Sequence, residues 1–279
     1  MRLRLLSVTI LVSVLGTGLA SADPEYYLAL GDSLSVGIQP SRTGADVRTS
    51  QGYVDDLFAF YRTRVPGLQL KKLGCSGETT ATMLTGGVCT YPDAPSQLAA
   101  AIAFIATHRV RFITIDIGAN NIDGCIDLTT SPPTIDQSCV LIGILQAQQQ
   151  VPMILAALRG AAPEVRIFAI NYYDPLVALS IFGQVGVQLA QESLQGTLAL
   201  NGVLAAAYGA ADVAVADVAR TFRITDFTPV PLLGIPLNAL LALSWTWMGA
   251  QPPVGPNVHP NALGYAVIAG TLVQAIGQP

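Results

Sequence analysis

The chain has 279 residues, of which 51% are hydrophobic and only 11% are charged. Its 14 basic and 18 acidic residues give a formal net charge of −4, without the excess of basic residues that nucleic acids and anionic membranes attract. A chain of this length can bury a large core, and we expect one domain rather than two.

The first 22 residues have the pattern of a secretory signal peptide. Arg2 and Arg4 precede an apolar stretch at 5–19, and small residues ending at Ala22 complete a cleavage site. The alternative is an uncleaved membrane anchor, but the stretch is shorter than the roughly 20 residues that a spanning helix needs. We therefore expect a secreted or periplasmic protein with a single mature domain over residues 23–279. Loss of the two arginines leaves twelve basic against eighteen acidic residues, a net charge of about −6.

Four cysteines remain, and an even number in an exported chain favours disulfides over free thiols. Of the three possible pairings, proximity in the sequence favours Cys75 with Cys89 and Cys125 with Cys139. In the chain-entropy model, each such bridge contributes about 3 kcal/mol to stability. A zinc site is the alternative, but the sequence has no C-x-x-C pair. We expect neither a metal site nor a cofactor.

Short apolar runs alternate with helix-like segments along the chain. The first run, 26–30, is too short for a helix and suits a strand buried on both faces. Residues 39–51 have no hydrophobic period and are expected to form a polar loop. Further strands are expected at 68–73 (an edge strand), 112–117, 165–170 and 213–218. Apolar spacings of three and four predict helices at 53–61, 95–108, 140–160 (kinked or restarted at Pro152), 186–208 and 261–276. This alternation predicts a parallel sheet with helices on both faces.

Polar or glycine-containing turns follow the first three predicted strands. Ser33 follows the first strand, Gly77 the second and Asn120 the third. Because open α/β sheets bind ligands at the carboxyl ends of their strands, we expect these turns to converge, and His259 lies in a late loop that can reach them. Acyl transfer needs a hydroxyl nucleophile, a base and donors for an oxyanion. We assign Ser33 as nucleophile, His259 as base, and the Ser33 and Gly77 N–H groups with the Asn120 amide as donors.

Two acids near these turns have expected structural roles. Asp32 is expected to organise the Ser33 turn by hydrogen bonding rather than to act as a catalytic acid, because the side chains of adjacent residues rarely point at one target. Asp116, inside a strand, is a candidate buried partner for a backbone or hydroxyl group. Asn120 has a second interpretation as a turn residue with positive φ.

Four segments of the chain together resemble a known family. Gly31-Asp32-Ser33-Leu34, Cys75-Ser76-Gly77, Gly118-Ala119-Asn120 and His259-Pro260 are similar, in order and spacing, to the motif blocks of the GDSL, or SGNH, hydrolases. The resemblance covers nearly the whole mature chain and points to the secreted bacterial esterase and lipase branch. It implies a flavodoxin-like three-layer α/β/α fold with a central parallel sheet of about five strands. It also implies hydrolysis of carboxylic esters through an acyl-serine intermediate.

Two positions depart from the family pattern. Asn121 stands where the third block commonly has an acid, and Pro256 stands three residues before His259, where the last block usually has an aspartate. A histidine base needs a group that fixes its tautomer and stabilises its positive charge. We expect a Ser–His dyad supported by a backbone oxygen, with the Pro256 carbonyl as candidate. Asp174 and Asp226 are possible acids from elsewhere in the chain.

The expected substrates are small-molecule or lipid-like esters with short to medium acyl chains. The apolar segment 227–256 is too rich in proline for one helix; it either lines an acyl-chain groove, forms a partial lid or packs as core. We expect a monomer that neither inserts stably into a membrane nor binds nucleic acid. Polysaccharide deacetylation is the alternative within hydrolases. A non-catalytic secreted binding module is the alternative of another class, and Pro256 is its best support.

Overall fold

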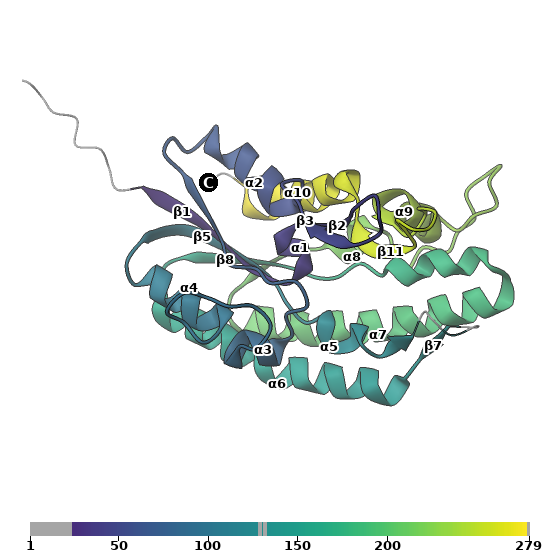
Figure 1. Cartoon of the computed structure of the whole chain (residues 1–279), viewed down its shortest axis with the longest axis horizontal. Coiled ribbons are helices and arrows are strands. Elements are labelled where there is room, and N and C mark those ends of the chain that lie inside the picture. Colours follow the sequence, from purple (N-terminus) through teal and green to yellow (C-terminus); the bar gives the residue numbers. More distant parts are fainter. Residues whose placement is uncertain (1–23, 128–129, 131–132, 278–279) are drawn as a thin grey trace, which may run out of the picture.

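The computed structural model describes residues 24–127, 130 and 133–277. A parallel sheet lies between two layers of helices, as the alternation of strands and helices predicts (Figure 1). The expected signal peptide, residues 1–22, lies outside the described residues.

The central sheet has five parallel strands in the order β4-β1-β5-β8-β9. The second predicted strand is β4, and it lies at an edge of the sheet, as its alternating pattern predicts. The chain order reverses beside β1, because β4 flanks it on one side and β5 on the other. Ligand sites of open α/β sheets lie at such a reversal. The strands are β1 (Glu25–Gly31), β4 (Gln69–Lys72), β5 (Arg109–Asp116), β8 (Arg166–Ile170) and β9 (Ala214–Ala216).

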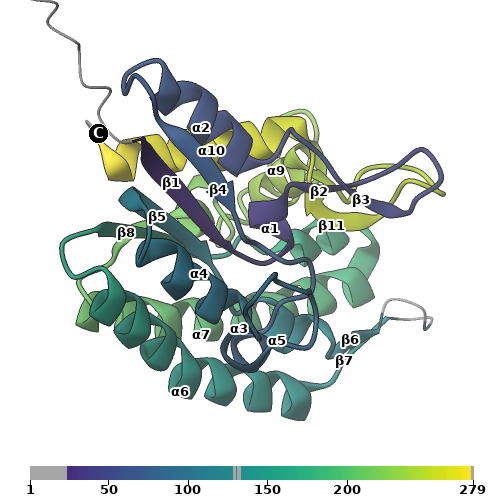
Figure 2. The same cartoon turned by 60° about the vertical axis from the view of Figure 1, so that its left-hand side comes forward.

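The helices cover both faces of the sheet (Figures 1 and 2). One layer contains α2 (Tyr53–Arg62) and α10 (Ala262–Ile276), which pack against each other. The other contains α3 (Thr80–Thr85), α4 (Gln97–Ile105), α5 (Asn120–Asp123), α6 (Gln137–Ala161) and α7 (Gly183–Ala210). The remaining short helices are α1 (Ser33–Val36), the 3-10 helix η1 (Pro175–Ile181), α8 (Val218–Thr221) and α9 (Leu237–Trp245).

Helix α6 is continuous through Pro152, so of the two alternatives, a kink or a restart, the restart does not occur. Among the described residues it is the one helix with the length and mean hydropathy, 1.4, that a membrane crossing requires. It packs against α3, α4, α5 and α7 within the helical layer.

Two hairpins occur in segments for which the sequence predicts no strand. Strands β2 (Ile38–Pro40) and β3 (Asp46–Arg48) pair within the expected polar loop, and β6 (Ile126–Asp127) pairs with β7 (Thr134–Ile135). These strands have two or three residues and mix polar with apolar side chains, unlike the apolar segment around the equally short β9, which is why the pattern missed them.

The proline-rich segment 227–256 forms several short elements rather than one helix, as expected. It contains α9 and then β10 (Thr246–Trp247), which pairs with β11 (Asn257–Pro260). Trp245, at the end of α9, packs edge-on against buried Phe222. Both predicted disulfides, Cys75–Cys89 and Cys125–Cys139, are present.

Candidate active site

The Ser33 turn is fixed from within the sheet. Gly31 ends β1 with φ of +136°, and a Cβ at this position would clash with the Asp116 carbonyl, so only glycine fits. Asp32 accepts hydrogen bonds from the Leu34 N–H (2.9 Å) and from the Tyr172 hydroxyl (2.7 Å). Asp32 therefore organises the turn, as predicted, and Ser33 is the first residue of α1.

Asp116 supports this turn from the neighbouring strand β5. Its carboxylate accepts hydrogen bonds from the backbone N–H groups of Asp32 (3.0 Å) and Ser35 (3.3 Å), and from the Tyr53 hydroxyl. Burial, with the Asp32 carboxylate nearby, raises the pKa of Asp116 well above its ordinary value. The expectation that this acid is a buried partner for backbone and hydroxyl groups is confirmed.

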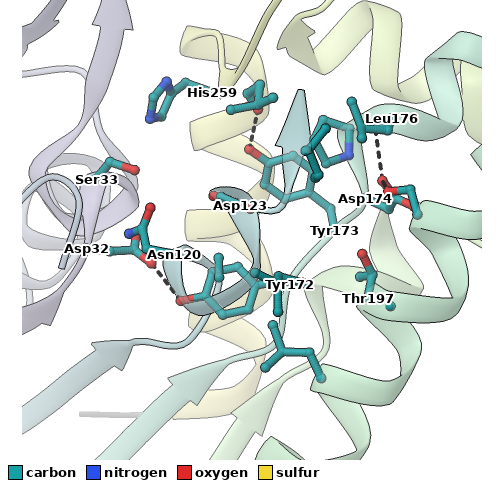
Figure 3. Close-up of a pocket in the computed structure, with 18 of the residues that line it drawn as sticks. Asp32, Ser33, Asn120, Asp123, Tyr172, Tyr173, Asp174, Leu176, Thr197 and His259 are labelled. Carbon is teal, nitrogen blue, oxygen red and sulfur yellow. Dashed lines mark hydrogen bonds between the residues drawn. The ribbon is translucent and has the colours of Figure 1, made fainter. Parts of the chain in front are cut away.

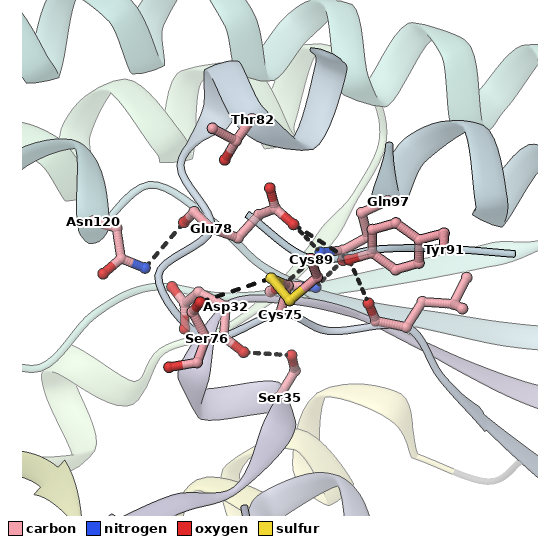
Figure 4. Close-up of a disulfide and its surroundings, with 12 residues drawn as sticks. Asp32, Ser35, Cys75, Ser76, Glu78, Thr82, Cys89, Tyr91, Gln97 and Asn120 are labelled. Carbon is pink, nitrogen blue, oxygen red and sulfur yellow. Dashed lines mark hydrogen bonds between the residues drawn. A yellow bond between two sulfur atoms is a disulfide. The ribbon is translucent and has the colours of Figure 1, made fainter. Parts of the chain in front are cut away.

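The Gly77 turn is tied to the same place by a disulfide and a buried polar network (Figure 4). The Cys75 N–H donates to the Gly31 carbonyl (3.0 Å). The Gln97 amide donates to the Gly31 carbonyl (3.0 Å) and to the Glu78 carboxylate (2.8 Å). Gly77 has φ of +82°, a backbone conformation that favours glycine.

The third turn places Asn120 beside Gly77. The Asn120 amide nitrogen donates to the Glu78 carbonyl at 2.9 Å (Figure 4). Asn121, which stands at the family's acid position, instead binds Thr80 twice: it accepts from the backbone N–H (3.0 Å) and donates to the hydroxyl (2.7 Å). Asn121 thus joins α5 to α3.

The predicted base, His259, lies on β11 and is mostly buried. Its Nδ1 is 2.9 Å from the side-chain oxygen of Asn257, which also accepts the His259 backbone N–H at 2.9 Å. The Asn257 amide nitrogen donates to Asp46 Oδ1 at 2.8 Å, and Asp46 Oδ2 is 3.7 Å from Nδ1. Burial lowers the pKa of His259 below its ordinary value, and the carboxylates of Asp46 and Asp32 oppose that shift.

None of the three expected partners is the described hydrogen-bond partner of His259. Among the described residues, the hydrogen bond of its Nδ1 is to Asn257 rather than to the Pro256 carbonyl. Asp174 caps η1 through the Leu176 N–H (2.9 Å) and accepts from the Ser193 hydroxyl (2.8 Å), and burial raises its pKa to about 7.

Asp226 is also engaged elsewhere, in an ion pair with Arg223 at 2.8 Å. The expected backbone oxygen is therefore replaced by the side-chain oxygen of Asn257. This residue was missed because an asparagine two residues before a histidine carries no family pattern. Asp46 was missed because it lies more than 200 residues earlier, in a segment expected to be an irregular loop.

One cavity of about 360 Å³ brings the predicted residues together: Ser33, Gly77, Asn120 and His259 all line it (Figure 3). The Ser33 hydroxyl and the His259 ring lie at the same end of the cavity (Figure 3), and no hydrogen bond joins these two described side chains. The far part of the cavity is apolar and is formed by α5, the β6–β7 hairpin, α6, η1 and α7. Its aliphatic residues are Ile122, Ile126, Ile135, Val140, Leu176 and Leu200.

The segment 227–256 contributes none of the described residues that line this cavity. The interpretation of this segment as an acyl-chain groove is therefore wrong for this cavity. For α9 the alternative interpretation, that it packs as part of the core, fits better. Ala239 and Ala242 of α9 are buried, whereas Leu232 and Leu233 in the preceding turn are exposed. The aliphatic side chains that line the cavity come instead from α5, the β6–β7 hairpin, α6, η1 and α7.

A model of the GDSL-like lipase/acylhydrolase family matches residues 29–267. The chain belongs to this family. A search of curated proteins found no match. Membership of the family makes the protein a carboxylic ester hydrolase.

Solved structures similar to this GDSL-like hydrolase include two from Streptomyces. An extracellular lipase from Streptomyces rimosus is 19% identical with a TM-score of 0.60, and the match covers 90% of this chain and 99% of the lipase. Phospholipase A1 from Streptomyces albidoflavus is 18% identical with a TM-score of 0.56, covering 91% and 100%. A lipase from a goat rumen metagenome is 17% identical with a TM-score of 0.55, covering 90% and 96%. At these identities the likeness establishes the shared three-layer fold.

Proposed function

We propose that this GDSL-like hydrolase is a secreted serine esterase or lipase in which Ser33 is the nucleophile and His259 the general base. The observation that carries the proposal is the single cavity that Ser33, Gly77, Asn120 and His259 line together. These residues come from four separate parts of the chain, and acyl transfer requires the groups that they supply.

The hydrogen bonds of His259 support its role as a base. The Asn257 oxygen beside Nδ1 can only accept, so Nδ1 carries the proton and Nε2 is left with a free lone pair. Burial lowers the pKa of the histidine, which favours the neutral ring that a base requires. Nε2 takes the proton of the Ser33 hydroxyl as its oxygen attacks the ester carbonyl carbon. The same proton then passes to the departing alcohol, and water repeats the sequence on the acyl-serine.

Three donors face the oxyanion in this scheme. The Ser33 N–H lies in the first turn of α1, where backbone N–H groups have no partner within the helix. The Gly77 N–H comes from the turn that the disulfide holds. The Asn120 amide nitrogen carries two hydrogens: one donates to the Glu78 carbonyl, and the other is available for the oxyanion.

The cavity favours an uncharged ester with an apolar acyl group. Its far part is lined by aliphatic side chains, which suit short to medium acyl chains. Acidic residues also line it, among them Asp46, Asp123, Asp174 and Glu192. Burial raises the pKa of Asp123 and of Asp174 to about 7, but the described lining holds no lysine or arginine, so anionic substrates such as phospholipids are disfavoured. We expect neutral, lipid-like esters to be the preferred class.

Further parts of the proposal concern the protein as a whole. The two disulfides and the signal-like pattern of residues 1–22 support export to an oxidising compartment. The steps above use only protein groups and water, so we propose that the reaction needs no metal or cofactor. We further propose that the mature chain, residues 23–279, acts as one domain and as a monomer.

The proposal is tested by labelling the mature protein with a fluorophosphonate and mapping the adduct by mass spectrometry. We expect one adduct, on Ser33, and none in the Ser33→Ala variant, whose kcat on p-nitrophenyl butyrate should fall by about 10⁴-fold or more. Ser76→Ala, in the neighbouring turn, is the matched control and should keep both labelling and turnover. Full activity in Ser33→Ala would refute the assignment. Faster release of acetate from acetylated xylan than from simple esters would favour a deacetylase instead.

A further inference from the structure

The β2–β3 hairpin lies against the loop that carries the proposed base. Figures 1 and 2 both place this hairpin beside β11, and β2 and β11 are in contact. Residue 44, at the hairpin tip, approaches so closely that a Cβ there would clash with the Pro253 carbonyl. A side-chain hydrogen bond from Asn257 to Asp46, 2.8 Å long, joins the end of the hairpin to β11. The hairpin and the histidine loop are therefore one packed unit.

The carboxylate of Asp46 decides which way the amide of Asn257 faces. A carboxylate only accepts hydrogen bonds, so the amide nitrogen must point toward Asp46 and the amide oxygen must point away from it. That oxygen then receives both the backbone N–H and the ring Nδ1–H of His259. If the amide were reversed, its N–H groups would face a backbone donor, and the favoured ring tautomer would be lost.

Asp46 also supplies a negative charge that the C-terminal part of the chain lacks. Residues 227–279 contain no aspartate, glutamate, lysine or arginine. Any charge that stabilises a protonated His259 must therefore come from another part of the molecule. Two acids act on the ring: Asp46, whose Oδ2 is 3.7 Å from Nδ1, and Asp32, the residue before Ser33. Asp123 lines the same cavity.

We infer that Asp46 is a positioning residue for this hydrolase: through Asn257 it fixes the tautomer of His259 and stabilises its positive charge, replacing the acid that Pro256 displaces. The inference rests on the proposed function of His259 as base. Asp46 lines the edge of the same cavity, but it acts on the reaction through His259: Oδ1 binds the Asn257 amide, and Oδ2 lies 3.7 Å from the ring Nδ1. Two residues from distant parts of the chain thus divide the work of one acid: Asn257 accepts the Nδ1 hydrogen bond, and Asp46 supplies the nearby negative charge.

Variants at position 46 separate orientation from charge. Asp46→Ala removes both, and we expect kcat on p-nitrophenyl butyrate to fall by about 10- to 100-fold, since a hydrogen bond to a charged network is lost. Asp46→Asn keeps an acceptor for the Asn257 amide, so the fall should stay below about tenfold. In Asp46→Asn the acidic limb of the pH profile of kcat/KM should move to lower pH, because a carboxylate that raises the histidine pKa is gone.

A charge-swap variant gives the sharper test. In Asp46→Asn/Asn257→Asp the carboxylate lies directly beside His259, and position 46 keeps a hydrogen bond to position 257. We expect activity near that of the wild type and an acidic limb at higher pH. Asn257→Asp alone should be less active than the swap, because it places two carboxylates in contact.

Two controls keep this test independent of folding and of the proposed function. Thr43→Ala, at the exposed hairpin tip, should leave turnover and pH profile unchanged, and the melting temperature of each variant reports the fold. Stoichiometric fluorophosphonate labelling of Ser33 in each variant confirms the nucleophile separately, so failure of the Asp46 role is distinguishable from failure of the Ser33 role. A wild-type kcat and acidic limb in Asp46→Ala, or a swap variant whose limb does not rise, would overturn the inference.

Discussion

The turn that carries Ser33 and the loop that carries His259 are held in opposite ways. The Ser33 turn continues the central strand β1. Two buried side chains, Asp116 of β5 and Gln97 of α4, form hydrogen bonds with its backbone. The His259 loop follows a proline-rich segment at the outside of the sheet. Its ring is oriented through Asn257 by Asp46, whose side chain is 44% exposed.

This difference indicates where each half of the site is sensitive to change. The nucleophile depends on the core, so substitutions there should cost stability as well as activity. The base depends on a surface pair, so substitutions there should alter the pH profile and turnover while the fold persists. The following predictions test that division.

Gly31→Ala should have the largest effect of the substitutions in the Ser33 turn. The new Cβ would clash with the Asp116 carbonyl in a backbone conformation with φ of +136°, so we expect a loss of about 4 kcal/mol or more in the free energy of unfolding. Gly67→Ala is the matched control: φ is +82° but the site is open, and the expected cost is about 1 kcal/mol. Denaturant titration measures both, and equal costs would contradict a tightly packed turn.

Asn120→Ala should affect turnover rather than stability. If its amide is an oxyanion donor, kcat on p-nitrophenyl butyrate should fall by about 10²- to 10³-fold. Asn121→Ala is the control in the same turn, because that side chain binds Thr80 and should mainly cost stability. An unchanged kcat in Asn120→Ala would remove Asn120 from the oxyanion site. The alternative of a turn residue with positive φ is wrong, because Asn120 is the first residue of helix α5.

The two disulfides should differ in their effect on catalysis. Each double Cys→Ser variant should lose about 3 kcal/mol of stability, because both bridges close loops of the same length. Only loss of Cys75–Cys89 should also lower kcat, since that bridge holds the Gly77 turn (Figure 4). Thermal melts and kinetics on both variants check this, and an equal kcat in the two would contradict it.

Tyr173→Phe should have the smallest effect. The Tyr173 hydroxyl donates to the Val258 carbonyl at 2.8 Å, next to the base, and its loss should cost about 1 kcal/mol. We expect a decrease in kcat of a few-fold with Ser33 labelling intact. A decrease as large as that of Asp46→Ala would show that Tyr173 contributes as much as Asp46 to holding the loop.

The sequence predicts one half of the site better than the other, for a physical reason. Short apolar runs and helical spacings locate all five strands of the central sheet and the turns that follow β1, β4 and β5, and proximity in the sequence predicts both disulfides. Even the roles of Asp32 and Asp116 follow from their places beside a strand end. The partners of His259 could not be found, because a hydrogen bond between Asn257 and Asp46 depends on how two short hairpin segments pack together.

Trapping the covalent intermediate tests the role of Ser33 most directly. The mature protein is mixed with p-nitrophenyl acetate, quenched in acid within milliseconds, digested and analysed by mass spectrometry. We expect an acetyl group on the peptide that contains Ser33, absent in Ser33→Ala and formed more slowly in His259→Ala. Acetylation of a different residue at a rate that matches turnover, or unchanged turnover in Ser33→Ala, would contradict that role.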